Sequence, residues 1–92
     1  MTHDAAETLG IQALAWLAAD DDLFAVFLGA SGASAAEVKA QAGDPAFLGA
    51  VLDFLLMDDA WVIAVSDQLG LPYDALFQIR QNLPGGDLPN WT

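Results

Sequence analysis

The sequence predicts an all-α fold, a compact bundle of about six short helices. Apolar residues recur at helical spacing, and almost no segment alternates between apolar and polar residues as a half-buried strand does. Typical helix start and stop signals, Asp or Ser before a segment and Gly or Pro after it, divide the chain into six segments. Because 92 residues leave room for one core, we expect one domain at residues 1–84 and a flexible tail at 85–92.

Most of the predicted helices begin at a residue that can cap their free N–H groups. Asp4 is the expected cap of the first helix, Ser34 and Glu37 form a capping-box pattern, and the pair Asp44-Pro45 starts the fourth helix. The pair Leu71-Pro72 opens the sixth. Capping explains most of the acidic residues, since they lie at such starts. The predicted helices cover residues 4–18, 20–28, 34–42, 45–57, 61–69 and 71–83.

The fourth predicted helix is apolar on nearly every side, which is typical of a central helix. Its one charged residue, Asp53, is expected at the solvent-facing edge, or else buried and paired with Arg80. Residues 45–65 are long enough to span a bilayer, but their aspartates favour a buried core. The first and fourth helices should supply that core, and Trp16 and Trp61 lie on apolar helix faces that point into it.

The two halves of the sequence resemble each other. A shift of 37 residues aligns Asp21 with Asp58, and a shift of 38 aligns Gly32 with Gly70. Each half then contains a helix, an Asp-Asp pair, a second helix, a glycine turn and a third helix. Two interpretations stay open: an internal duplication, or a chance alignment of alanine-rich helices. A duplicated pair of three-helix units should pack face to face across the fourth and fifth helices.

The chain is strongly acidic, with thirteen Asp and Glu residues against two cations, Lys39 and Arg80, and a net charge of −11. This charge repels phosphate backbones and anionic lipids, so we expect no binding to nucleic acid or to a membrane. The lack of cysteine excludes disulfides and thiolate chemistry. The N-terminal residues do not match a secretion signal, so a cytoplasmic protein is expected.

Few residues are candidates for catalysis or for metal binding. The single histidine is His3, and no serine lies in a nucleophile-elbow motif. The acidic run at residues 20–22 lacks the alternating ligands and central glycine of a calcium loop, and no glycine-rich segment has the lysine of a phosphate loop. We therefore expect no catalytic residue, no metal and no cofactor.

Three segments carry a likeness to a known family: residues 13–18 (Ala-Leu-Ala-Trp-Leu-Ala), 44–53 (Asp-Pro-Ala-Phe-Leu-Gly-Ala-Val-Leu-Asp) and 55–59 (Leu-Leu-Met-Asp-Asp). Together they resemble a family of short bacterial proteins, the domain of unknown function 3572. The resemblance covers about residues 9–83 and implies a compact all-helical fold, but no activity and no site residues. The sequence departs from the family pattern at Trp61 and at residues 71–73.

The chain is 55% apolar, which is more than so small a domain can bury. The surplus favours a protein partner or self-association. We therefore expect a non-enzymatic protein-interaction module, most simply a homodimer. Two alternatives are an acidic mimic that binds a basic protein surface, and a small-ligand carrier or enzyme with a cleft near Asp53. The candidate interaction residues are Phe54, Met57, Trp61 and Val65 on the fourth and fifth helices, and Trp91 in the tail.

Overall fold

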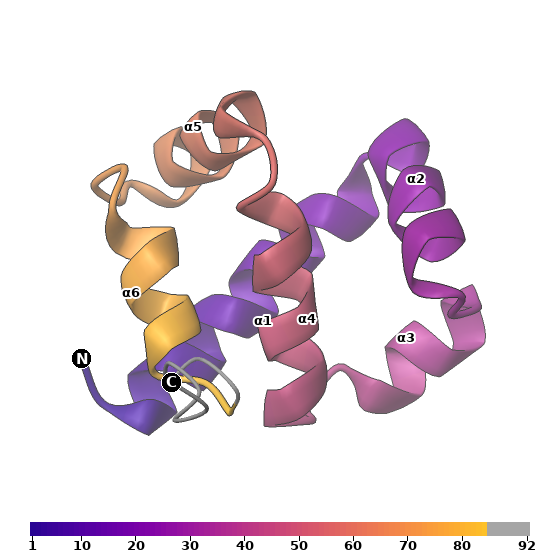
Figure 1. Ribbon diagram of the computed structural model, residues 1–92, viewed down its shortest axis with the longest axis horizontal. Coiled ribbons are helices and arrows are strands. Elements are labelled where there is room, and N and C mark those ends of the chain that lie inside the picture. The colour runs from indigo at the N-terminus through magenta and orange to yellow at the C-terminus, as the bar shows by residue number, and fades with distance from the viewer. Residues whose placement is uncertain (85–92) are drawn as a thin grey trace, which may run out of the picture.

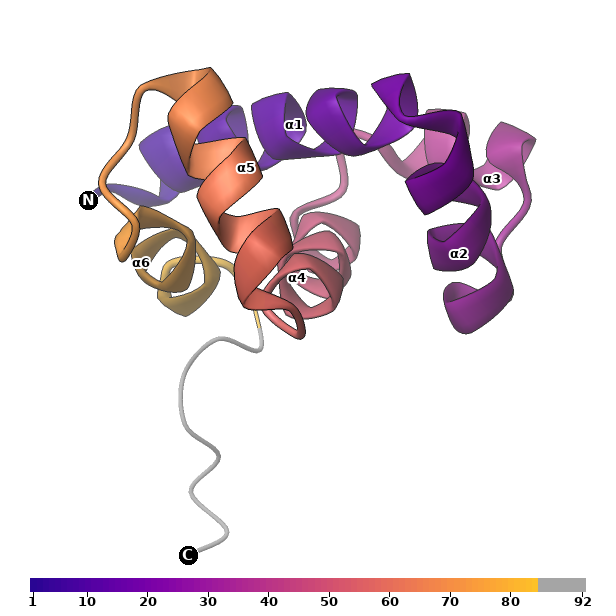
Figure 2. The same cartoon turned by 90° about the horizontal axis from the view of Figure 1, so that it is seen from above.

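The computed structural model describes residues 1–84, and this part of the chain forms six α-helices and no strand. The helices are α1 (His3–Ala19), α2 (Asp21–Ser31), α3 (Ala35–Gln41), α4 (Pro45–Leu55), α5 (Asp59–Leu69) and α6 (Ala75–Gln81). The long helix α1 crosses α4 in the middle of the molecule, while the pairs α2–α3 and α5–α6 lie at opposite ends (Figures 1 and 2). The predicted all-α class is confirmed.

Side chains just before the helices cap many of their free N–H groups. Asp20, Asp44 and Asp58 each accept a backbone N–H through Oδ1, at the starts of α2, α4 and α5. Ser34 and Glu37 form the expected capping box of α3, with both hydrogen bonds 3.2 Å long. These acidic residues therefore stabilise helix ends, as their positions in the sequence predict.

Three helix starts differ from the prediction, and one of them is that of α5, which begins at Asp59 instead of Trp61. Thr2, rather than Asp4, caps α1: its Oγ1 atom accepts the N–H of Ala5, and the helix begins at His3. The sixth helix begins only at Ala75, because the preceding residues form a turn in which the carbonyl of Pro72 accepts the N–H of Ala75. Asp44 caps the helix that starts at Pro45, whereas Leu71 has no side-chain acceptor that could cap a helix starting at Pro72.

The core lies mainly between α1 and α4, as predicted. Leu17 of α1 and Leu52 and Leu55 of α4 are completely buried in it. Phe27 of α2 extends the core to one end of the molecule, and Leu76 of α6 extends it to the other. Burying a side chain of this size contributes about 1.5–3 kcal/mol, so these contacts hold the helices together.

Helices α2 and α5 occupy matching places in the two halves of the chain, at a shift of 38 residues. Helices α2 and α5 both have 11 residues, follow a capping aspartate (Asp20 and Asp58) and end at a glycine. Those glycines, Gly32 and Gly70, have positive φ angles of 76° and 68°, a conformation that favours glycine. Helices α3 and α6 both have seven residues, but the shift between them is 40 residues because α6 starts late.

The shift of 37 residues expected for the first part of each half is therefore wrong by one. At a shift of 38, buried Ala13 matches buried Val51, and the caps match too. A shift of 37 instead pairs buried Ala13 with exposed Ala50. The expectation that the halves meet across α4 and α5 is also wrong, because the first half contacts the second mainly through α1, which packs against α4 and α6.

No single helix within residues 1–84 has the length and the apolarity needed to cross a membrane. The pair α2 and α3 has enough apolar residues in total, but the chain bends by 85° between the two helices. Apolar α4 is short, and most of its large side chains are buried in the core.

Candidate protein-interaction site

Asp53 lies on the exposed side of α4 and forms an ion pair with Arg80 of α6. The Nε and Nη2 atoms of Arg80 donate to Oδ1 and Oδ2 of Asp53 at 2.6 and 3.1 Å. The Asp53 side chain is 59% exposed and that of Arg80 is 16% exposed. The solvent-facing position expected for Asp53 is thus confirmed, and the pairing with Arg80, expected only for a buried carboxylate, occurs at the surface.

Gly49 makes room for the guanidinium group of Arg80. A Cβ atom at position 49 would lie 2.8 Å from Nη1 of Arg80 and 3.1 Å from the carbonyl oxygen of Pro84. That Nη1 atom also donates a hydrogen bond of 2.9 Å to the Pro84 carbonyl. Arg80 therefore ties α6 to α4 and to residue 84, which is a structural role.

A groove between α2 and α4, here called the α2–α4 groove, has the strongly exposed Met57 at its rim. The Phe27 and Phe54 rings of its floor meet edge to face with centroids 5.2 Å apart, and Phe54 stacks on Trp61 at 4.9 Å. Met57 is 77% exposed because α4 ends at Leu55 and the chain turns there toward α5. The groove has a volume of about 250 Å³ and is lined by Phe27, Ala30, Ser31, Ala50, Asp53, Phe54 and Met57.

The predicted interaction residues therefore have different environments. Phe54 and Met57 line the α2–α4 groove, and half-buried Trp61 lies behind Phe54. The expectation that Phe54 and Val65 stay uncovered is wrong, because Phe54 is 6% exposed and Val65 is completely buried. The ring of Phe27 packs against Phe54, and Val65 lies on α5, which packs against α1 and α6. Trp91 lies outside the described residues.

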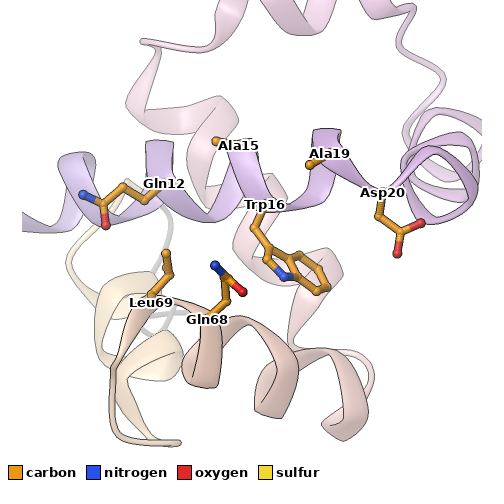
Figure 3. Close-up of a pocket in the computed structure, with 7 residues that line it drawn as sticks. All are labelled: Gln12, Ala15, Trp16, Ala19, Asp20, Gln68 and Leu69. Atoms are coloured by element: carbon orange, nitrogen blue, oxygen red, sulfur yellow. The ribbon is translucent and has the colours of Figure 1, made fainter.

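A larger groove, the α1–α5 groove, lies between helices α1 and α5 (Figure 3). The indole ring of Trp16 lies in it with the Gln68 amide on one side and the Asp20 carboxylate on the other (Figure 3). Trp16 contacts the core as its spacing predicts, but it is only half-buried. The groove has a volume of about 570 Å³ and is lined by Gln12, Ala15, Trp16, Ala19, Asp20, Gln68 and Leu69.

The sequence contains a pattern that could have predicted one side of the α1–α5 groove, although Trp16 was expected only in the core. Gln12, Trp16 and Asp20 are spaced by four residues, so they lie in a row along α1 beside its apolar stripe. Gln68 and Leu69 come from α5, more than 45 residues away in the chain. No local pattern relates them to Trp16, so only the packing of α5 on α1 reveals this side of the groove.

A third groove, formed by α1, α2 and α3, is almost entirely apolar. Its one charged lining residue is Lys39, and its volume is about 310 Å³. Exposed Ile11 and half-buried Phe24 are among its apolar lining residues.

The described residues contain few groups arranged for catalysis. No three His, Asp or Glu side chains within residues 1–84 lie together as metal ligands. Ser66 is buried, and its Oγ has no hydrogen-bond partner in the same part of the chain. Tyr73 donates a hydrogen bond of 2.9 Å to Oδ1 of Asp67, and this bond and the carboxylate charge raise the pKa of Tyr73 above its ordinary value of 10.0. Nucleophilic catalysis requires a hydroxyl and a base together in a binding site. Ser66 has no such base in the described residues, and Tyr73 and Asp67 line none of the grooves described above.

The described part of the chain is thus a small all-helical protein with grooves between its helices. The chain belongs to the family described as Protein of unknown function (DUF3572), whose model matches residues 3–86. The resemblance carried by residues 13–18, 44–53 and 55–59 is thereby confirmed. Neither a curated protein nor a solved structure matches the chain.

Proposed function

We propose that the protein is a non-enzymatic protein-interaction module that forms a homodimer through the α2–α4 groove. The observation that carries this proposal is Met57, 77% exposed beside a floor of Phe27 and Phe54. Methionine is flexible and polarizable, and it makes favourable contacts with aromatic rings. An apolar surface that covers Met57 and the groove removes both from water, which favours association.

A second copy of the chain is the occupant that fits this surface. In a two-fold dimer the same patch meets itself, so Met57 of each copy can enter the groove of the other. The volume of about 250 Å³ suits a single side chain better than a whole helix. Asp53 at the edge of the groove is already paired with Arg80, so the Asp53 carboxylates of two copies repel each other only weakly.

Sedimentation equilibrium of the full chain, over a range of protein concentrations at low and high salt, tests the proposal. We expect a dimer that persists at high salt, because salt screens the repulsion between two copies of charge −11 and leaves apolar contacts intact. A monomer at every concentration and at both salt levels would overturn the proposal.

A pair of variants assigns the contact surface. Met57→Gln removes the thioether without adding charge, and we expect it to raise the dimer dissociation constant by about tenfold or more. Phe77→Gln is the matched control, because Phe77 is also exposed but lies on α6 away from the groove. Equal weakening by both variants would contradict a contact through the α2–α4 groove.

The ligand-carrier alternative has less support than self-association. A buried carboxylate at Asp53 would be the first sign of a ligand-binding cleft, whereas that side chain is 59% exposed and paired with Arg80. The acidic-mimic alternative depends on a different surface and does not compete with the homodimer.

A further inference from the structure

We propose that the α1–α5 groove binds an arginine side chain of a basic protein partner. The groove combines an aromatic ring, a carboxylate and two amides in about 570 Å³, a size within the usual range of ligand sites. None of its lining residues belongs to the α2–α4 groove, so this site is independent of the proposed homodimer.

Trp16 supplies the aromatic surface of the site. Its indole ring packs partly against the core, which holds the ring in place, while the rest of the ring lines the groove (Figure 3). A guanidinium cation is attracted to the face of an indole ring. Ala15, Ala19 and Leu69 provide apolar walls for the methylene groups of an arginine side chain.

Asp20 supplies the charge of the site. Its Oδ1 atom accepts the Leu23 N–H at 3.0 Å, and this capping bond orients the carboxylate. A carboxylate has about four acceptor positions, so it can still accept from a guanidinium group. The amide oxygens of Gln12 and Gln68 are further acceptors on the same groove. Arginine fits this set better than lysine, because its planar group both stacks on a ring and donates several hydrogen bonds.

The charge distribution also favours a cation in this groove. Lys39 lines the groove of α1, α2 and α3, and Arg80 is paired with Asp53, so neither lines the α1–α5 groove. Asp21 and Asp22 directly follow Asp20 at the start of α2. With a net charge of −11 over the whole chain, the long-range field attracts basic partners and repels anionic ones.

A titration of the ¹⁵N-labelled full chain with the blocked peptide Gly-Arg-Gly tests the site. We expect saturable NMR shifts of the Trp16 indole N–H and of the Gln12 and Gln68 side-chain amides. The same peptide with citrulline, an uncharged analogue of arginine, should bind about tenfold more weakly or worse, because it lacks the charge that pairs with Asp20. Equal shifts with citrulline, or no shift at Trp16, would overturn the proposal.

Two matched pairs of variants separate this site from general charge attraction. Asp20→Asn and Asp44→Asn each remove one charge from a helix cap that asparagine can replace, but only Asp20 lines the groove. We expect roughly tenfold weaker peptide binding for the first and less than about twofold for the second. Gln68→Glu should tighten binding several-fold, whereas Gln81→Glu, also in a last helical turn, should not. Equal effects within either pair would refute the assignment.

Discussion

Alanine at position 49 should destabilise the protein only while Arg80 is present. In a helix interior alanine is ordinarily more favourable than glycine by about 1 kcal/mol. At position 49, however, the new Cβ atom would lie 2.8 Å from Nη1 and 3.2 Å from Cζ of Arg80, so the guanidinium group must move. Its movement disturbs the hydrogen bonds to Asp53 and to the Pro84 carbonyl.

The exposure of the ion pair sets the size of this effect. Hydrogen bonds to charged groups contribute about 1.5–3 kcal/mol, whereas exposed ion pairs contribute about 0–1 kcal/mol. Asp53 is 59% exposed and Arg80 is 16% exposed, so we expect a loss of about 1–2 kcal/mol. After the helix-propensity gain is subtracted, Gly49→Ala should lower the free energy of unfolding by up to about 1 kcal/mol.

A double-mutant cycle measures this coupling. Urea unfolding of the parent chain, Gly49→Ala, Arg80→Ala and the double variant should give a coupling free energy of about 1–2 kcal/mol. Gly29→Ala is the control, because a Cβ atom there meets nothing within 4 Å and should stabilise α2 by about 0.5–1 kcal/mol in both backgrounds. The reasoning is refuted if Gly49→Ala stabilises the parent chain as much as it stabilises the Arg80→Ala variant.

Two further predictions concern single hydroxyl groups. Ser66→Ala should raise the free energy of unfolding by about 1 kcal/mol, because it removes a buried hydroxyl without a partner in residues 1–84; a loss of stability in urea would contradict this. Tyr73 is the single tyrosine, and its phenolate absorbance should titrate above pH 10.0. Asp67→Asn should bring the pKa of Tyr73 back toward 10.0, whereas Asp74→Asn should leave that pKa raised. Because the folded-state pKa is raised, the stabilisation from this hydrogen bond is present below about pH 10 and is lost as the pH rises through that pKa. An unchanged titration in Asp67→Asn would refute this cause.

Local chemistry explains why the helices could be predicted from the sequence. A capping group acts on N–H groups two or three residues away, so the starts of α2, α3 and α4 follow from Asp20, Ser34 and Asp44 alone. Helical spacing likewise predicts which side of α1 or α4 is apolar. The late start of α6 shows the limit of such signals, because Leu71-Pro72 is compatible with a turn as well as with a helix start.

Long-range packing explains why the surfaces could not be predicted in the same way. Phe54, Met57 and Val65 are all apolar residues at helical spacing, yet one lines a groove floor, one is exposed and one is buried. Which of them is covered depends on where Phe27 and α1 lie, and no pattern within α4 or α5 contains that information.

The sequence by itself therefore determined the all-α class, most of the helix ends and a core between α1 and α4, because these depend on contacts within a few turns and on apolar periodicity. Only the tertiary structure decided the pairing of Asp53 with Arg80 over Gly49 and the meeting of Trp16 with Gln68. Each of these joins residues far apart in the chain, and their distance depends on how whole helices pack.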